Sequence, residues 1–395
     1  MSKLYFIVIL LTLAIPAFAN NFEEETDDPA SYTIDINDFW CRDPYIFVDE
    51  ATKSYYLHIN EAPYFGCYKS KNLVKWKKVG YSFTRPSNFW GTKDFWAPDA
   101  FYFEGSYYVF ATFSSDSQKR GVSVFKSNNA EGPFTPVVNA SLTRSDWNCL
   151  DGTLYIDQFE DPWMIFCHEW IDTRDGEIHA ARMSYDLSSL ESATLLFKAS
   201  SASYAGNDKV TDAPFIYEPE KGVMFCLWST FNKSNQYVIG VAKSSNGTLF
   251  GTWTQQEPLN DDNGGHAMIF EGFDGVLRIS YHAPNTDPHL TIKRIAYRNG
   301  SLRLVAGDIS DNSSTGIGNI HPETTAVVFR NNQLQFSSDS EMCVQAYDLQ
   351  GRLITKGQIG QDDNRLSVKT NSPLVIVKTT DNHGNTHSSK LIKSN

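Results

Sequence analysis

The sequence of 395 residues has little positive charge, few cysteines and few long apolar segments. It contains 34 lysines and arginines but 46 aspartates and glutamates, which gives a formal net charge of −12. This negative charge disfavours nucleic acid and anionic membrane surfaces as partners. The six cysteines permit disulfides in an exported protein, but their spacing fits no zinc cluster. Cys167 and Cys226 are expected to be buried free thiols.

The one long apolar run covers residues 4–18 and follows Lys3. Because a small-x-small site ends at Ala19, we expect residues 1–19 to be a cleaved signal peptide. The run is shorter than the roughly 20 residues that cross a bilayer, so no membrane insertion is expected. Residues 20–37 are expected to be an acidic leader. The mature protein is therefore predicted to be exported, to the periplasm, the cell surface or the medium.

Aromatic residues make up 14% of the chain, and they recur in a fixed pattern with β-branched residues. An acidic or imidazole residue opens an apolar run, a turn follows, and a second aromatic-rich run closes the pair. The five opening residues are Asp43, Asp99, Asp151, Asp212 and His266. They are 56, 52, 61 and 54 residues apart, a period typical of one four-stranded propeller sheet. The sequence therefore predicts an all-β fold, with a five-bladed β-propeller over residues 38–315.

The first strand of each blade in a propeller lines the central axis, so the opening residues should converge at one mouth. A large antiparallel sandwich is the alternative fold, but it predicts no regular phase between opening residue and hairpin. Crowded carboxylates resist joint ionisation, which raises the pKa of some of them. The convergence therefore indicates chemistry rather than stability.

Residues 323–395 lose the long period and alternate like the strands of a small antiparallel β-sandwich, with turns at DLQG and DNHGN. The runs AYDLQGRLI and VKTTDNHGNTHSSKLIK resemble the C-terminal sorting-type domain of exported enzymes of Bacteroidetes. Sorting and packing against the propeller are both open roles for this module.

Five motifs in fixed order carry a second resemblance: RDPYIF (42–47), WAPDAFYFEGSYYVFAT (96–112), LDGTLYID (150–157), GEIHAARMSYDL (176–187) and GHAMIFEGFDGVLRISYH (265–282). Over residues 38–310 the chain resembles glycoside hydrolase family 43. The resemblance implies a five-bladed propeller with an inverting mechanism. It also implies plant-type polysaccharide or oligosaccharide substrates that contain arabinose or xylose.

The family pattern implies an aspartate base on the first blade, a tuning aspartate on the third and an acid on the fourth, which match Asp43, Asp151 and Asp212. An inverting enzyme needs one carboxylate to deprotonate water and one carboxylic acid, about 6.5–9.5 Å away, to protonate the leaving oxygen. The acid keeps its proton when a second negative charge lies nearby. Asp151 would supply that charge to Asp212.

The fourth-blade motif departs from the family, which usually has Glu-x-Pro where this chain has Asp212-Ala213-Pro214. Aspartate is one methylene shorter, which places its proton about 1 Å farther from the substrate. Three outcomes are open. Asp212 is the acid on a shifted backbone, Glu169 reaches in instead, or the protein is a catalytically lapsed sugar-binding propeller. Asp212 could also be a plain turn residue before Pro214.

The resemblance implies that His266 holds a cation, often calcium with several waters, at the propeller axis, although a core histidine is the alternative. Asp99 is expected to brace the pocket or to contact a substrate hydroxyl. Three tryptophans precede opening residues, where each could stack on a sugar or pack in the core: Trp40, Trp96 and Trp147. Together with Asp99 and Glu169 they are the candidate substrate-binding residues.

Overall fold

The structure, a computed structural model, describes residues 27–311 and, farther along, 327–330, 332–336, 342–348, 353–360, 365–370, 374–381 and 386–392. Its helical elements are the single turn α1 (Trp170–Thr173) and the 3-10 turns η1 (Pro29–Ser31), η2 (Ile36–Asp38) and η3 (Ala199–Ser201). The expected signal peptide lies outside the described residues, as does the start of the expected leader, so both stay predictions. Within the described part of the chain, no helix has the length and apolar character to span a bilayer.

Five antiparallel sheets follow one another along the chain, each built from consecutive strands. The first sheet contains β1 (Ile34–Asp35), β5 (Lys75–Thr84), β4 (Tyr64–Ser70), β3 (Ser54–Glu61) and β2 (Ile46–Asp49). The second contains β6 (Lys93–Phe103), β7 (Ser106–Ser115), β8 (Gln118–Ser127) and β9 (Thr135–Pro136). The third contains β10 (Cys149–Ile156), β11 (Pro162–His168), β12 (Glu177–Arg182) and β13 (Thr194–Lys198). The fourth contains β14 (Asp212–Glu220), β15 (Val223–Phe231), β16 (Tyr237–Ser244) and β17 (Trp253–Gln256). The fifth contains β18 (Gly265–Glu271), β19 (Leu277–Ala283), β20 (His289–Arg298) and β21 (Ser301–Val305).

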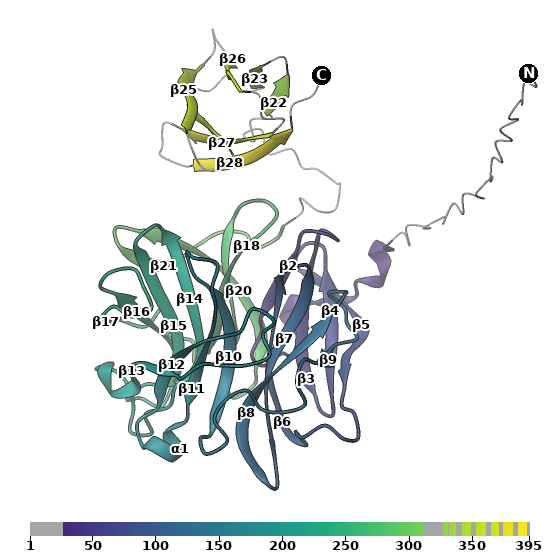
Figure 1. Cartoon of the computed structure of the whole chain (residues 1–395), viewed down its shortest axis with the longest axis vertical. Helices are drawn as coiled ribbons and strands as arrows, with labels where there is room; N and C mark the ends of the chain where they lie inside the picture. The colour runs from purple at the N-terminus through teal and green to yellow at the C-terminus, as the bar shows by residue number, and fades with distance from the viewer. Residues whose placement is uncertain are drawn as a thin grey trace, which may run out of the picture.

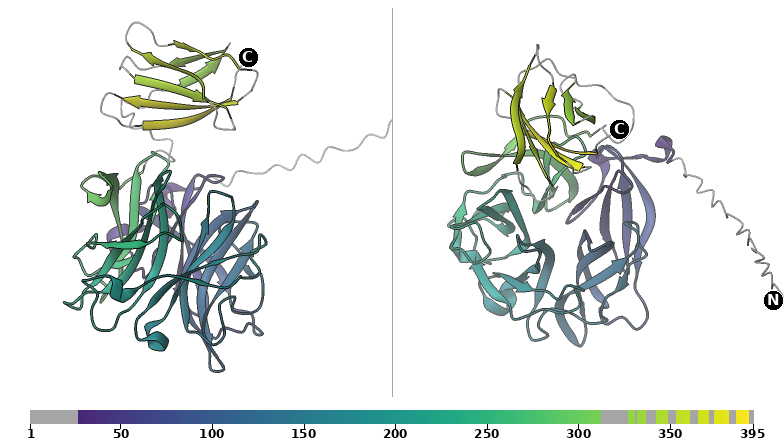
Figure 2. Two further views of the ribbon diagram at one scale, coloured as in Figure 1. Left: turned by 60° about the vertical axis from the view of Figure 1, so that its left-hand side comes forward. Right: turned by 45° about the horizontal axis from the view of Figure 1, so that its top comes forward.

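These five sheets stand in a ring around one central axis (Figures 1 and 2). Residues that lie in, or directly precede, the first strand of every sheet line a small cavity on that axis. This is the arrangement that the repeat period predicts for five propeller blades. The alternative of two sheets stacked face to face does not describe it.

Apolar side chains fill the contact between each pair of neighbouring sheets, and one buried cluster belongs to each contact. Between the first and second sheets, for example, the Phe83 ring lies 4.7 Å from Phe125 and 6.1 Å from Phe113. The contact between the fifth and first sheets has its own cluster, in which Tyr55 packs on Phe270 at 6.2 Å. Burial of apolar surface therefore continues around the whole ring.

Backbone pairing adds to this closure at the contact between the last and first sheets. The segment before β2 runs beside the start of β20, where the Cys41 N–H donates to the Pro288 carbonyl at 3.0 Å and the Leu290 N–H donates to Phe39 at 2.9 Å. Trp40 and His289 form an isolated antiparallel bridge. The N-terminal segment thus occupies backbone groups that would otherwise be exposed at a sheet edge.

Arg278 anchors the chain where it leaves the fifth sheet. Its fully buried guanidinium donates to both carboxylate oxygens of Asp274, at 2.8 and 2.6 Å, and to the carbonyls of Ile309 and Ser310, at 2.9 and 3.1 Å. The next residue, Asp311, donates its N–H to the first sheet and accepts from the Tyr55 hydroxyl. Arg278 and Asp311 together therefore fix the exit segment against both sheets.

Arg278→Met should lower the free energy of unfolding by about 3 kcal/mol, because it leaves a partly buried carboxylate and two carbonyls without their donor. Urea denaturation followed by tryptophan fluorescence measures this loss. The control is Lys93→Met, which removes an exposed ion pair to Asp116 and should leave the denaturation midpoint unchanged. Equal midpoints for the two variants would show that Arg278 is not an anchor.

The C-terminal part forms two further antiparallel sheets. One contains β22 (Val327–Arg330), β23 (Gln333–Phe336) and β26 (Arg365–Ser367), and the other contains β25 (Leu353–Ile359), β24 (Met342–Tyr347), β27 (Leu374–Asp381) and β28 (Thr386–Ile392). Residues of both sheets share one buried cluster, for example Phe329 and Leu334 with Val344 and Val375. That these two sheets make the expected small β-sandwich stays a prediction. The sorting-type resemblance and the boundaries at 315 and 323 stay predictions.

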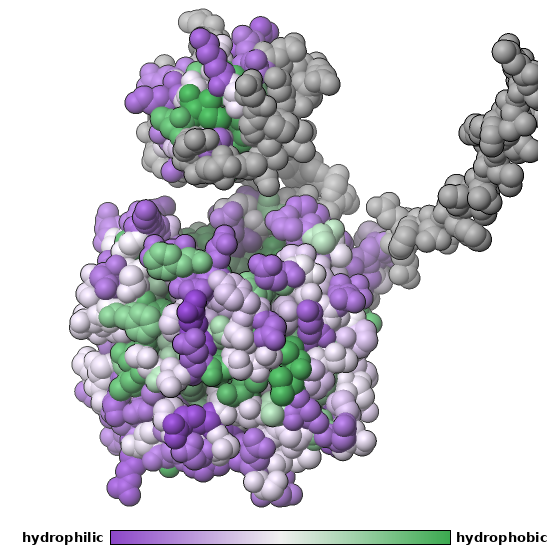
Figure 3. Space-filling model, viewed as in Figure 1, coloured by the Kyte–Doolittle hydropathy of each residue, from purple (hydrophilic) through white to green (hydrophobic). Residues whose placement is uncertain are grey.

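The surface carries little continuous apolar area in the view of Figure 3, where green atoms form separate patches among hydrophilic ones. All six cysteines are free, and Cys167 and Cys226 are buried thiols as expected. The fold therefore depends on apolar packing and hydrogen bonds rather than on disulfides.

Candidate functional site

An unusual backbone conformation recurs near the start of the first strand in every sheet. Five residues with positive φ occupy this place: Asp43 (56°), Ala97 (44°), Asp151 (52°), Ala213 (50°) and His266 (60°). In the second to fifth sheets the strand register shifts at this residue, as in a β-bulge. Positive φ is costly for residues other than glycine and clusters at functional sites. We therefore call these five positions the axial bulges.

The axial bulges correct the repeat read from the sequence. They are 54, 54, 62 and 53 residues apart, which is a more even spacing at the start of the ring than the expected opening residues gave. Asp99 lies two residues after its bulge and Asp212 one residue before its own, so only Asp43, Asp151 and His266 are equivalent. The bulge places a residue outside the two-residue alternation, and sequence alignment by strand pattern could not detect that shift.

Side chains of neighbouring strands hold the bulges in place. The Asp43 N–H donates to His282 Nδ1 at 3.2 Å, the Asp151 N–H to Thr112 Oγ1 at 2.9 Å, and the His266 N–H to Ser229 Oγ at 2.8 Å. These three partners lie on the second strand of the preceding sheet in the ring. In the fourth sheet the Ala213 N–H donates to the Asp151 carboxylate at 2.9 Å.

The His266 ring lies between the carboxyl groups of the first and third sheets. Its Nδ1 is 3.0 Å from Asp43 Oδ1 and 3.9 Å from Asp151 Oδ2. Burial alone would lower the pKa of His266, but the charges of Asp43 and Asp151 raise it to about 10. Burial would raise the pKa of Asp43, yet the charge and hydrogen bond of His266 lower it to about 2. At neutral pH the pair is therefore an imidazolium beside a carboxylate.

The pKa values of Asp151 and Asp212 are raised, in contrast to that of Asp43. Burial raises the pKa of both, and the charge of Asp151 raises that of Asp212 further. The Tyr237 hydroxyl donates to Asp212 Oδ2 at 2.9 Å and opposes this rise. Burial also raises the pKa of Asp99, to about 7. The site thus combines one firmly ionised carboxylate with carboxyl groups that hold protons near neutrality.

The acidic groups and His266 differ in solvent exposure, which decides which of them a substrate could contact. Asp43 and Asp212 are half-buried, whereas Asp99, Asp151 and His266 are buried. Only the first two could reach a substrate at the mouth. The arrangement therefore offers a base in Asp43 and a proton donor in Asp212, with buried groups that set their protonation.

Glu169, the alternative acid, is engaged elsewhere. Its two carboxylate oxygens accept from Arg120 Nε at 2.8 Å and Nη2 at 3.1 Å. Burial raises the pKa of Glu169, but the Arg120 hydrogen bonds and charge counter that rise. A carboxylate held by two guanidinium bonds is a poor proton donor. Glu169 is not among the residues that line the axial cavity, and its carboxylate pairs with Arg120 of the second sheet instead.

The three candidate tryptophans differ in environment. Trp40 is 53% exposed and free to stack on a ligand. Trp96 has the Arg120 guanidinium 4.8 Å from its ring centroid, and Trp147 stacks on His168 at 4.1 Å with an interplanar angle of 2°. Trp40 is the one of the three that best suits a sugar platform. Trp147 packs against protein instead.

Two residues of the site were not singled out from the sequence. His282 holds the bulge at Asp43, donates through Nε2 to Asn285 at 3.1 Å and stacks on Tyr237 at 5.6 Å. It ends the quoted fifth-sheet motif, so its place opposite Gly265 could have been inferred from the hairpin register. Tyr237 begins the third strand of its sheet and carries no sequence signal for its contact with Asp212.

The axial cavity also allows a test of the expected cation. Asp99, Asp151 and His266 line it, and the buried Asp99 Oδ1 has no hydrogen-bond partner. An unpaired buried carboxylate oxygen is a ligand that calcium prefers. The Asp99 carboxylate therefore fits a cation, whereas His266 could ligate the ion through Nε2 only as a neutral imidazole, because a protonated ring has no free lone pair.

With this geometry described, the chain can be compared with known proteins. Residues 35–302 match the sequence profile of glycosyl hydrolases family 43. The chain belongs to this family. An endo-arabinase from Bacteroides thetaiotaomicron VPI-5482 is 48% identical, with a TM-score of 0.67 over 69% of this chain and 99% of that chain.

Two further family 43 comparisons are more distant. An endo-1,4-beta-xylanase from the same organism is 25% identical, with a TM-score of 0.58 over 68% of this chain and 95% of that chain. A β-xylosidase/α-arabinofuranosidase from a compost metagenome, solved with xylotriose in a calcium-free form, is 16% identical, with a TM-score of 0.56 over 70% and 97%. The latter shows the fold alone. Together the comparisons support glycoside hydrolase activity.

Tyr237→Phe should move the alkaline limb of the kcat/KM profile to higher pH. The lost hydrogen bond stabilises the ionised form of Asp212, so its removal raises the pKa of the acid, by roughly one unit or more. Tyr281→Phe is the control, because its hydroxyl donates to Asp262 at 2.7 Å, outside the axial cavity. A limb that stays in place or moves to lower pH in Tyr237→Phe would remove Asp212 from the acid role.

Proposed function

We propose that this family 43 protein is a secreted hydrolase that cleaves arabinose-containing glycans by single displacement, with xylose-containing glycans as the second substrate class. One observation carries the proposal: two half-buried carboxyl groups at the same mouth are held in opposite protonation states. His266 keeps Asp43 ionised, and burial beside Asp151 keeps Asp212 protonated. The 48% identity to an endo-arabinase supports the choice of arabinose.

Asp43 takes a proton from water, whose oxygen forms a bond to the anomeric carbon. The bond from that carbon to the leaving oxygen breaks at the same time, and the leaving oxygen takes the proton of Asp212. The reaction ends with Asp43 protonated and Asp212 ionised, and exchange with solvent restores both. His266 stabilises the Asp43 carboxylate at the start, and Tyr237 stabilises the Asp212 carboxylate that the reaction produces.

Asp151 acts through its neighbours. It accepts the Ala213 N–H, which fixes the peptide that follows Asp212, and its charge favours the protonated acid. The same hydrogen bond fixes the backbone from which the shorter side chain of Asp212 extends. We propose that this hydrogen bond positions Asp212 for proton donation despite the missing methylene.

A cation bound at Asp99, with His266 in its neutral form, would add positive charge beneath the mouth. Calcium would supply electrostatic stabilisation there and no proton transfer. Trp40 would provide the stacking surface for a sugar ring, which suits its exposed indole.

Asp212→Ala should lose at least about a hundredfold in kcat/KM on arabino-oligosaccharides, whose leaving oxygen needs a proton. On a 2,4-dinitrophenyl arabinofuranoside the loss should stay below about tenfold, because that phenolate departs without protonation. Asp43→Asn is the matched comparison and should lower both rates alike, since every substrate needs the activated water. Glu169→Gln should leave the ratio of the two rates at its wild-type value.

Equal losses on both substrates in Asp212→Ala, or a selective loss in Glu169→Gln, would contradict the assignment. Wild-type protein that cleaves neither substrate but binds arabino-oligosaccharides in calorimetry would instead identify a lapsed, sugar-binding propeller. The observation that favours this second function is Asp212 itself, which is one methylene shorter than the glutamate that the family usually has at this position. Asp212→Glu would then be expected to restore cleavage.

A further inference from the structure

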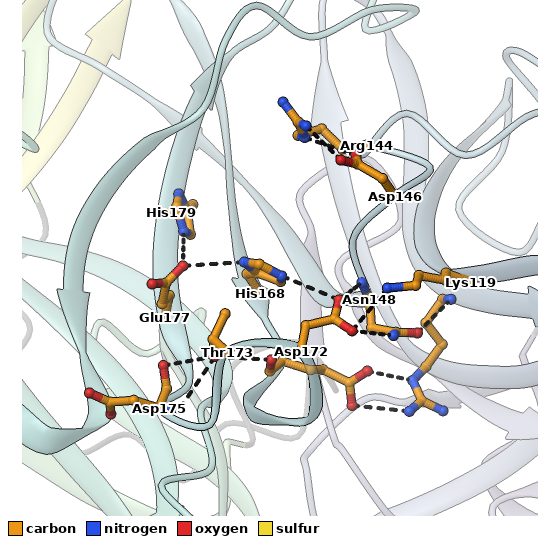
Figure 4. A network of polar contacts seen from close by, with 12 residues as sticks. Lys119, Arg144, Asp146, Asn148, His168, Asp172, Thr173, Asp175, Glu177 and His179 are labelled. Atoms are coloured by element: carbon orange, nitrogen blue, oxygen red, sulfur yellow. Dashed lines mark hydrogen bonds and ion pairs between the residues drawn. The ribbon is translucent and has the colours of Figure 1, made fainter.

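A second group of ligand-type side chains lies in the third sheet, apart from the axial cavity. His168 on β11 pairs directly with Glu177 on β12, and His179 lies two residues farther along β12. Residues two apart on a strand face the same side, so the three side chains converge. Figure 4 shows them pointing toward one another. We call them the blade-three triad.

Two imidazole nitrogens approach the same carboxylate oxygen of the triad. Glu177 Oε2 is 2.9 Å from His179 Nε2 and 3.2 Å from His168 Nδ1, and the three ligand atoms lie within 4.8 Å of one another. Both rings are buried, at 5% and 7% exposure. These separations resemble those between ligands of a first-row metal, for which each ligand bond is about 2.0–2.2 Å.

The outer contact of His168 also suits a metal, whereas the buried far nitrogen of His179, Nδ1, has no hydrogen-bond partner. The second nitrogen of His168 lies 3.3 Å from Asp172 Oδ2, and Asp172 is itself held by the Asn148 N–H at 2.6 Å and by Lys119 at 3.0 Å. A carboxylate on the far nitrogen of a ligating histidine fixes its tautomer. If His168 carries its proton on Nε2, toward Asp172, its Nδ1 lone pair faces the Glu177 carboxylate. Two hydrogen-bond acceptors then lie in contact at a buried position, which is unfavourable.

We propose that the blade-three triad binds a divalent first-row metal ion, with Zn²⁺ as the best match to two imidazoles and one carboxylate. A cation between His168 Nδ1, His179 Nε2 and Glu177 Oε2 removes the repulsion and leaves a fourth position for water. Lys198, 2.8 Å from Glu177 Oε1, neutralises the other carboxylate oxygen. The alternative to a metal is a second proton on His168, with which Nδ1 would donate to Glu177 Oε2.

The position of the triad gives the metal a structural role. It joins β11 to β12, and through His168 and Asp172 it reaches the turn α1. Glu169 directly precedes α1 and meets Arg120 of the second sheet. A metal there would fix the loop that carries Glu169 without contact with the reacting groups.

The test is titration of chelator-treated full-length protein with Zn²⁺ by calorimetry and with Co²⁺ by visible absorption, both with calcium in excess to fill the axial site. We expect one Zn²⁺ to bind per chain and the Tm to rise on metal addition. The visible absorption bands of bound Co²⁺ should be those of an ion with few ligands. Glu177→Gln should weaken binding by at least about a hundredfold, and Asp172→Asn by roughly 10- to 100-fold as an outer partner.

Asp146→Asn is the matched control, because its carboxylate pairs with Arg144 at 2.7 Å beside the triad without contacting it. This variant should bind like the wild type. Wild-type protein that binds no more metal than Glu177→Gln, with both apo forms folded by circular dichroism, would overturn the proposal and assign the contacts to a doubly protonated His168. Because the readout is metal binding, this failure is independent of glycosidase activity.

Discussion

One buried positive charge governs the axial site. The His266 ring faces the carboxyl groups of Asp43 and Asp151, and without its proton these acids would face one another in a place poor in water. The imidazolium stabilises the nearest carboxylate most strongly. Burial raises the pKa values of the remaining acids, and the charge of Asp151 raises that of Asp212 further. The proposed base and the proposed acid at the same mouth follow from this unequal sharing of one charge.

The ring of sheets delivers that arrangement through its backbone. Every sheet carries an axial bulge, whose positive φ is unfavourable for any residue with a side chain. At Asp43, Asp151, Ala213 and His266 a side chain of the preceding sheet accepts the bulge N–H. Such strain persists only where the surroundings over-determine it. Apolar clusters at all five contacts, with the Arg278 anchor and the pairing of the N-terminal segment with β20, supply that rigidity. Stability elsewhere in the ring therefore offsets the cost of the site.

Much of this could be read from the sequence, because hydrophobic alternation and turn residues report strands directly. The all-β class, a period of 52 to 61 residues and the convergence of Asp43, Asp151, Asp212 and His266 all follow from that pattern. The offsets of Asp99 and Asp212 from the bulges could not, since a bulge adds one residue without changing the strand pattern. Contacts between distant strands were also hidden, as in Tyr237 with Asp212 and Glu169 with Arg120.

The most direct test of the central claim is the configuration of the first-formed sugar, followed by proton NMR on an unblocked arabino-oligosaccharide. If Asp43 activates water on the face opposite Asp212, the new reducing end appears first with inverted configuration and mutarotates afterwards. A first-formed product of retained configuration would require a covalent intermediate on a carboxylate. That result would contradict the assignment of Asp43 as a base.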